Sequence, residues 1–183
     1  SDIKNTKTLS PAPVALTASP VNATDFTANW NSSTGAESYL LYVSTNSGCA
    51  NNFVGSYDGS TNVGNVSLNT ISGLSEGTTY YYKVIAVNAS GNSAASNIIS
   101  VVTLPPAPTN LTSGSVTTNS FVASWTGSDG ATGYLLSVSE SDFDEVNAVA
   151  GYWGKNVGTA TSFSVTGLEA GTTYYFQVKA YNN

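Results

Sequence analysis

One pattern of residues occurs twice in this chain, about 95 positions apart. The first half of the pattern consists of Pro11-Ala12-Pro13, Trp30 and Tyr39-Leu40-Leu41, which recur as Pro106-Ala107-Pro108, Trp125 and Tyr134-Leu135-Leu136. A repeat of this length indicates two whole domains in series, because the units of solenoid proteins run about 20 to 50 residues. Small domains that are duplicated in series commonly act as spacers, as display scaffolds or as binding modules. The repeat therefore bears on function as well as on fold.

The composition excludes several classes of function. The 183 residues carry a net charge of -6, with five cationic side chains, no His and no Arg. Nucleic-acid binding is not expected, because neutralising phosphates requires clustered Lys and Arg. Membrane insertion is not expected either, because every apolar stretch is far shorter than the roughly 20 residues of a membrane span. Catalytic triads and the commonest zinc sites use His, so we expect no enzyme activity.

Alternating residue types predict β-strands in both copies. Val, Thr and Tyr are plentiful and the helix formers Glu, Lys and Arg are scarce, which favours an all-β fold. The predicted strands are residues 26–30, 39–43, 66–71, 80–87 and 98–103, followed by 121–125, 134–138, 162–166 and 174–181. In the first copy, the alternation assigns these side chains to the core: Tyr39, Leu41, Val43, Tyr80, Tyr82, Val84 and Ala86.

A motif in the second half of each copy suggests a family. Gly-Leu-x-x-Gly-Thr-x-Tyr-x-x-x-Val begins at Gly73 and again at Gly167. Together with the Pro-rich start, the Trp and the following Tyr, it resembles the fibronectin type III domain over residues 11–183, in the form found in secreted or cell-surface bacterial multidomain proteins. The resemblance implies two immunoglobulin-like β-sandwiches in series. It also implies that Tyr80 and Tyr174 are tyrosine corners, whose hydroxyls bond to backbone upstream.

Both ends of the sequence follow the same repeat. Residues 1–9 align with residues 96–104, so we expect them to be strand G of a preceding repeat. Residues 181–183 align with residues 87–89, so we expect the second domain to lack its own strand G in this sequence. The chain is therefore divided into a strand-G-like segment at 1–9, a first domain at 10–104 and a second domain at 105–183.

A strand F without its neighbour presents unpaired backbone groups to which another strand can add. In one interpretation, the sequence is simply a window on a longer array of such domains. In the other, chains join head to tail. Nine extended residues reach about 30 Å, roughly one domain length, so the segment could hardly fold back to the second domain of its own chain but could reach that of another molecule. The residues that would then add to that domain are Ile3, Lys4, Asn5, Thr6, Lys7, Thr8 and Leu9.

Two candidate interaction surfaces follow from the strand pattern. The outer face of the first domain would present Leu40, Tyr42, Tyr81, Lys83, Ile85 and Val87. Such a face either contacts a neighbouring repeat, a surface protein or a glycan, or consists of the scattered apolar residues that soluble proteins carry. The second candidate is an exposed aromatic platform of Tyr152 and Trp153, with packing in a strand C′ as the alternative.

Two further features concern metals and thiols. Four acidic residues crowd the loop after residue 138: Glu140, Asp142, Asp144 and Glu145. Their oxygens suit Ca²⁺, but no EF-hand-type loop accompanies them, so a solvated acidic loop is the alternative and we expect no cofactor. The single Cys49 cannot form an internal disulfide and is expected to be a buried or half-buried thiol.

These features predict a non-catalytic structural segment, serving as a stalk, spacer or filament body. Only 9% of the residues are charged, a composition common on secreted bacterial proteins, so an extracellular or cell-surface location is expected. The expected partners are neighbouring repeats of the same or a similar chain. Two alternatives stay open: an adhesion or carbohydrate-binding module, and linker repeats of a secreted polysaccharide hydrolase.

Overall fold

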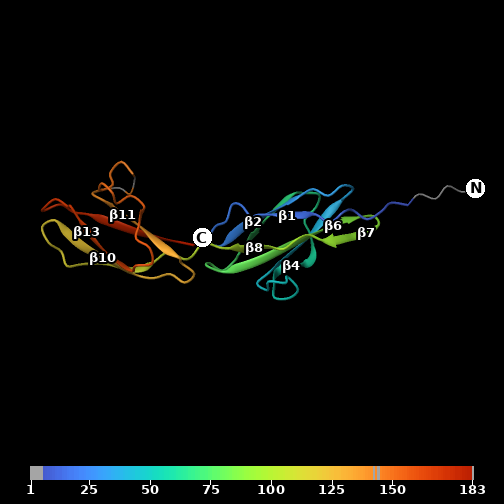
Figure 1. The fold of residues 1–183 in the computed structure, drawn as a ribbon, viewed down its shortest axis with the longest axis horizontal. Helices are drawn as coiled ribbons and strands as arrows, with labels where there is room; N and C mark the ends of the chain where they lie inside the picture. Colours follow the sequence, from blue (N-terminus) through green and yellow to red (C-terminus); the bar gives the residue numbers. More distant parts are fainter. Residues whose placement is uncertain (1–5, 142, 144, 183) are drawn as a thin grey trace, which may run out of the picture. The chain divides into compact units, whose positions relative to one another are not determined.

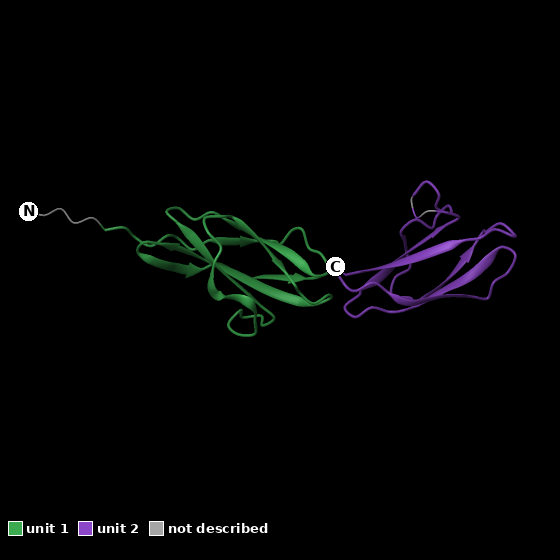
Figure 2. Ribbon diagram, turned by 180° about the vertical axis from the view of Figure 1, so that it is seen from behind, with its two compact units in different colours: residues 1–103 green, residues 104–183 purple. Residues whose placement is uncertain are grey.

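The computed structural model describes residues 6–141, 143 and 145–182, which form strands, turns and loops (Figure 1). The chain divides into two compact units, unit 1 at Ser1–Thr103 and unit 2 at Leu104–Asn183 (Figure 2). The predicted all-β fold is confirmed. Within the described part, no helical segment has the length and hydrophobicity of a membrane span.

Unit 1 is a sandwich of two antiparallel sheets. One sheet has the order β1 (Val14–Leu16), β2 (Asp25–Asn31), β5 (Leu68–Ser72). The other has the order β4 (Phe53–Asn62), β3 (Ser38–Ser44), β6 (Thr79–Asn88), β7 (Gly91–Ala95), and β8 (Ile99–Val102) pairs with β6 as well. Strand β6 is therefore paired along both of its edges, with β3 on one side and with β7 and β8 on the other.

Unit 2 repeats the arrangement with fewer strands. One sheet has the order β13 (Ser162–Thr166), β10 (Ser120–Thr126), β9 (Thr109–Gly114). The other has the order β12 (Lys155–Asn156), β11 (Gly133–Ser139), β14 (Tyr175–Tyr181). Among the residues described, β14 pairs with β11 alone.

The core of unit 1 confirms the inward face predicted from alternation. Each of the seven predicted side chains is at most 4% exposed: Tyr39, Leu41, Val43, Tyr80, Tyr82, Val84 and Ala86. The ring of Trp30 packs on Tyr39 with a centroid separation of 5.7 Å. In unit 2, Trp125 packs on Tyr134 at the same separation. The repeated Trp and Tyr therefore build the same aromatic pair in both cores.

The predicted tyrosine corners are present in both units. The Tyr80 hydroxyl accepts a hydrogen bond from the backbone N–H of Ser75 at 2.9 Å. The Tyr174 hydroxyl accepts one from Glu169 at 2.9 Å. Each bond ties the strand to the loop five residues upstream, so the loop before each of these strands is held to its sandwich.

The strand predictions differ from the structure at several places. Strands β1, β9 and β12 lie outside the predicted ranges, and three further differences concern unit 1. Strand β5 begins at Leu68 rather than at residue 66, and Val66 is 40% exposed. The last predicted strand of unit 1 is shorter, at Ile99–Val102, and β7 precedes it on the same edge of β6. The ten-residue β4 was not predicted, because Gly55 and Gly59 interrupt its apolar pattern and its pairing with β3 is shifted by bulges.

Candidate functional site

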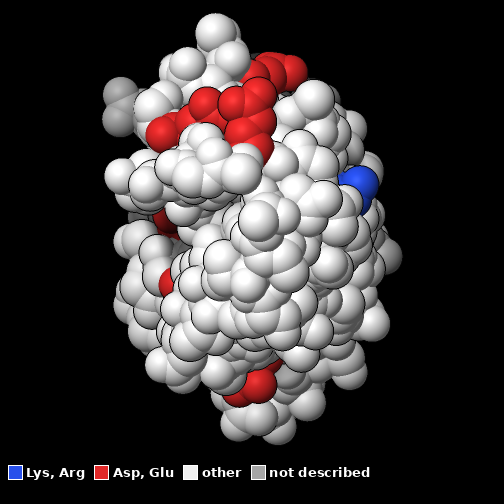
Figure 3. All heavy atoms as spheres, turned by 90° about the vertical axis from the view of Figure 1, so that its left-hand side faces the viewer, with Lys and Arg blue, Asp and Glu red and all other residues white. Residues whose placement is uncertain are grey.

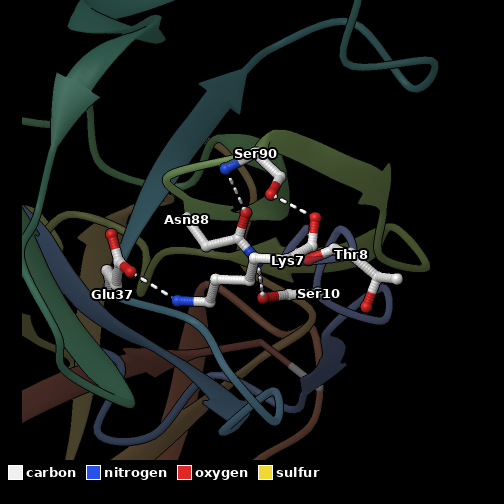
Figure 4. Close-up of polar contacts among 6 residues, drawn as sticks. All are labelled: Lys7, Thr8, Ser10, Glu37, Asn88 and Ser90. Carbon is white, nitrogen blue, oxygen red and sulfur yellow. Dashed lines mark hydrogen bonds and ion pairs between the residues drawn. The ribbon is translucent and has the colours of Figure 1, made fainter. Parts of the chain in front are cut away.

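The residues before β1 are held against unit 1 by the turn between β6 and β7 (Figure 4). Asn88 donates from Nδ2 to the carbonyl oxygen of Thr8 at 2.9 Å, and Ser90 donates from Oγ to that of Lys7 at 2.6 Å. Asn88 also donates to Oγ of Ser10 at 3.2 Å. We call residues 88–90 the anchoring turn and residues 7–11 the anchored segment.

The local sequence of the anchoring turn orients its side chains. The Asn88 side chain is buried, and its Oδ1 accepts a hydrogen bond from the N–H of Ser90 at 2.8 Å. This bond is the type by which Asn bonds to backbone two residues on, so the side chain shapes the turn. With Oδ1 engaged in this way, the Nδ2 group points toward the anchored segment (Figure 4).

Further polar contacts hold the anchored segment. Lys7 Nζ lies 2.5 Å from Oε1 of Glu37, and both side chains are about half exposed, at 48% and 55%. An ion pair this exposed contributes about 1 kcal/mol or less. Ser33 Oγ donates to the carbonyl oxygen of Pro11 at 2.5 Å. Three of the contacts reach carbonyl oxygens, so they recognise the course of the backbone more than the identity of the side chains.

The residues predicted for strand addition fall in and before this segment. Ile3, Lys4 and Asn5 lie outside the described residues. Thr6, Lys7, Thr8 and Leu9 are exposed and belong to no strand. Their addition to another molecule stays a prediction.

The outer face predicted on unit 1 lies on β3 and β6. All six of its residues are half-buried: Leu40, Tyr42, Tyr81, Lys83, Ile85 and Val87. Leu40 pairs with Ile85 and Tyr42 with Lys83, so these side chains are cross-strand neighbours. They form a continuous stripe across the two strands.

The Tyr42 ring is already packed by its own unit. The ring of Phe53 lies 5.9 Å away between centroids, and the Lys83 ammonium lies 5.0 Å from the ring centroid. Gly59 is pressed against the same ring, since a Cβ at that position would lie 2.0 Å from Cζ of Tyr42. The half-buried ring is therefore fixed in place by contacts within its own unit.

The two residues of the candidate aromatic platform on unit 2 differ in exposure, and the alternative of packing applies to Tyr152. Tyr152 is 9% exposed, belongs to the core, and accepts a hydrogen bond at its hydroxyl from the N–H of Thr166 at 2.9 Å. Trp153 is 40% exposed. The two neighbours separate because the chain turns here, with positive φ at Gly151 and Gly154.

The acidic loop offers no described metal site. Asp142 and Asp144 lie outside the described residues, and Glu140 and Glu145 are exposed. The described part of the chain contains no group of three or more His, Cys, Asp or Glu side chains that could hold a metal ion. Figure 3 shows a mostly uncharged surface on which carboxylates gather in a few separate clusters.

Cys49 is a fully buried free thiol, as expected. Burial raises its pKa above the ordinary 9.0, and the nearby Lys83 opposes this rise. Burial also raises the pKa of Tyr82 above its ordinary 10.0, against a hydrogen bond from the backbone of Asn29. Both groups are therefore held neutral in the core of unit 1.

Unit 1 is expected to lose stability in alkali. The unfolded chain releases the protons of Cys49 and Tyr82 at their ordinary pKa values, below those of the folded unit. The stability that these groups contribute is fully present below pH 9.0, begins to fall at the ordinary pKa values of 9.0 and 10.0, and is lost as the pH rises through the raised pKa values of the folded unit. Melting of unit 1 between pH 7 and pH 11 measures this, and Cys49→Ala should move the onset of the fall to higher pH. An unchanged onset in that variant would contradict the assignment to Cys49.

Comparison with known proteins identifies both units. A family model described as the fibronectin type III domain matches residues 11–102 and again residues 106–183. Chitinase A1 of Niallia circulans is 37% identical over 176 residues, which cover 87% of this chain and 22% of that protein. Exoglucanase B of Cellulomonas fimi is 30% identical over 178 residues, which cover 92% of this chain and 15% of that protein. The chain thus spans less than a quarter of these relatives.

One solved two-domain structure aligns with most of this chain. The two-domain fibronectin type III segment from chicken tenascin is 19% identical to this chain, with a TM-score of 0.45. The match covers 93% of this chain and 91% of that segment.

Proposed function

Because the chain belongs to the fibronectin type III family, with two domains of that family in series, we propose that it is a non-catalytic structural segment of an extracellular or cell-surface bacterial protein. Its role is that of a stalk, spacer or filament body whose neighbours are further repeats. In a filament body, units of one molecule would join those of the next head to tail by strand addition. A fold does not specify a function, so the role is argued from the contacts of the chain.

The anchored segment is the observation that carries this proposal. Residues 7–11 align with residues 102–106, where the sequence passes from the first repeat to the second. The segment is therefore equivalent to an interdomain linker, and in unit 1 it is held by Asn88, Ser90, Glu37 and Ser33. A linker held in this way keeps its course on the domain that follows it, and prolines stiffen it further. Such a joint suits a segment that serves as a spacer.

Loosening the anchoring turn is expected to expose the anchored segment to protease. Asn88→Ala removes the hydrogen bonds to Thr8 and Ser10, each worth about 1 kcal/mol. We expect trypsin to cleave after Lys7 roughly tenfold faster, because cleavage requires local opening. Mass spectrometry of a digestion time course measures the rate. Asn92→Ala, at an exposed position of β7, is the matched control and should leave the rate unchanged; equal rates in all three chains would contradict the anchoring role.

A second role is favoured by the similarity to Chitinase A1 and Exoglucanase B. In that role, the two units are linker repeats beside the catalytic domain of a secreted polysaccharide hydrolase. The complete reading frame decides between the two roles. A catalytic domain encoded in it supports linker repeats, whereas a longer run of similar repeats supports a stalk or filament body.

The structural role predicts that the chain does not bind polysaccharide. We expect the purified chain to stay in the supernatant when it is mixed with insoluble chitin or cellulose, because Tyr42 is half-buried and packed against Phe53 and Gly59, and Tyr152 is in the core. Retention on either polymer would instead support the adhesion or carbohydrate-binding module. Trp153→Ala and Tyr81→Ala would then show which unit carries the site, with the unchanged fold checked by circular dichroism.

A further inference from the structure

The first strand of unit 1 is short and yet is held along both of its edges. Strand β1 has only three residues, and all three pair with β2. A strand this short at the start of a domain frays easily, because few backbone hydrogen bonds tie it down. The attachment of β1 to the unit therefore depends on contacts other than its pairing with β2.

The side chain of Asn97 supplies the second edge of β1. The N–H of Ala15 donates to Oδ1 of Asn97 at 2.9 Å, and Nδ2 of Asn97 donates to the carbonyl oxygen of Ala15 at 3.0 Å. In an antiparallel pair, every second residue exchanges no backbone bonds with the facing strand. Ala15 is such a residue, so one amide side chain bonds to both of the backbone groups that β2 leaves free. We call the Asn97 side chain with these two bonds the latch.

The latch joins the two sheets of unit 1. Strand β1 belongs to the sheet with β2 and β5, whereas Asn97 lies in the connection between β7 and β8, which both pair with β6 in the other sheet. Tyr82 of β6 adds a contact through the core, because its hydroxyl donates to the carbonyl oxygen of Leu16. The same hydroxyl accepts from the N–H of Asn29 on β2 at 3.2 Å. Strand β1 is thus tied to the second sheet at two successive residues, Ala15 and Leu16.

The chain enters and leaves unit 1 at opposite ends of β6 (Figure 1). In the anchored segment, Thr8 is bonded to Asn88 at the end of β6, whereas Thr103 is bonded to Thr78, just before β6 begins. A pull on the two sides of the unit therefore acts along the strands. The bonds of an antiparallel pair are perpendicular to the strands, so such a pull loads them together rather than one after another.

The first and last strands of the unit are held differently. Strand β8 pairs with β6 over all four of its residues, and the fully buried Thr103 that follows it is bonded to Ser75 and Thr78. A pull from the other side passes from the anchored segment to β1, which has the shorter pairing. Asn97 precedes Ile99, the first residue of β8, by two positions. The latch therefore connects the shorter first strand to the start of the well-held last strand.

We propose that the latch transmits a pull on the anchored segment from β1 to the start of β8, so that β1 does not peel away from a unit that is otherwise folded. The inference rests on the proposed function, because a spacer between further repeats is pulled from both of its sides. A unit that lost β1 would lengthen under load and bring the buried Ala15 and Ala18 to solvent. The latch thereby keeps the length of the spacer fixed.

Single-molecule stretching of the whole chain tests the latch. Leu9→Cys and Leu104→Cys provide the two attachment points, because both side chains are exposed and flank unit 1. The natural Cys49 is buried and does not compete for the attachment. A pull applied at these points acts on unit 1 alone and does not pass through the bonds to Lys7 and Thr8. With the latch intact, we expect unit 1 to open in a single step.

Asn97→Ala should shorten the lifetime of folded unit 1 at a fixed force about thirtyfold, the factor that two hydrogen bonds of ordinary strength contribute. We also expect a short first step of up to roughly 35 Å, the extended length of residues 9–18, because the N–H of Ser19 is bonded to Thr27. Asn97 is exposed, so its substitution leaves the core intact. Tyr82→Phe, which removes the hydroxyl, should shorten the lifetime by a smaller factor.

Asn69→Ala is the matched control. Asn69 on β5 donates from Nδ2 to the Tyr57 hydroxyl at 3.3 Å and to the carbonyl oxygen of Thr70 at 3.2 Å, so this change also removes two hydrogen bonds of an Asn side chain. Neither bond involves β1 or β8, so we expect no first step and a much smaller change in lifetime. Equal lifetimes for Asn97→Ala and the control, or the absence of the first step in Asn97→Ala, would overturn the latch.

The outcomes separate the latch from the proposed function. If Asn97→Ala opened as the parent chain does, the latch would be overturned, but the protease and polysaccharide experiments would still judge the spacer role, because neither involves a pull. Retention of the chain on chitin or cellulose would contradict the spacer role and leave the measured lifetimes unchanged.

Discussion

Leu136→Ala is expected to lower the free energy of unfolding of unit 2 by about 3 kcal/mol and to leave unit 1 unchanged. Leu136 lies on β11, is fully buried, and belongs to the core that contains Trp125 and Tyr134. The loss combines the transfer free energy of the removed methyl groups with the cost of the cavity left behind. Calorimetry of the whole chain, with one transition assigned to each unit, measures the effect.

The repeat supplies a matched control for this prediction. Leu41 occupies the same position on β3 of unit 1 and is also fully buried. Leu41→Ala should destabilise unit 1 by a similar amount while unit 2 is unaffected. If either variant moved both transitions together, the two units would unfold as one cooperative body, which would contradict the model of a spacer built from independently folded units.

Gly59→Ala is expected to destabilise unit 1 by about 3 kcal/mol. Gly59 lies on β4 with a φ of +90°, and an added Cβ would lie 2.0 Å from Cζ and 2.2 Å from the hydroxyl oxygen of Tyr42. The alanine thus meets an unfavourable backbone conformation and also displaces the Tyr42 ring from its contacts with Phe53 and Lys83. Calorimetry of the whole chain, with the transition of unit 1 followed separately from that of unit 2, measures the loss.

Two further variants separate the backbone effect from the clash. Gly55→Ala, on the same strand, has a φ of +52° but no atom within 4 Å of the added Cβ, so its cost should be only about 1 kcal/mol. In a Tyr42→Ala background, Gly59→Ala should cost no more than Gly55→Ala does. Equal costs for Gly55→Ala and Gly59→Ala in the wild-type background would contradict the packing of Tyr42 on Gly59.

The close packing of Tyr42 changes how the outer face of unit 1 is interpreted. From the sequence, Tyr42 and Tyr81 were equal candidates for contact with a partner. In the structure, Tyr42 joins β3 to β4 through Phe53 and Gly59, so its substitution would disturb the sheet itself. Tyr81→Ala is therefore the better probe of binding at this face.

The candidate site was only partly predictable. Residues 1–9 could be recognised from the repeat as a strand-G-like segment followed by a linker, but the turn that holds it was not predicted. Asn88 has a counterpart at Asn182, and this repeated Asn was the available signal. Its role emerged only from its hydrogen bond to Thr8, which lies 80 residues away in the chain.

The sequence by itself determined the two units, their all-β class, the inward residues of β3 and β6, and the two tyrosine corners. These features depend on local alternation or on a contact five residues apart, so one repeat at a time is enough to recognise them. Only the tertiary structure decided that Tyr152 enters the core, that β4 pairs with β3 in spite of its glycines, and that Asn88 holds the segment before β1. Each of these depends on which distant strands lie side by side, because burial and backbone pairing are settled by neighbours in space rather than in sequence.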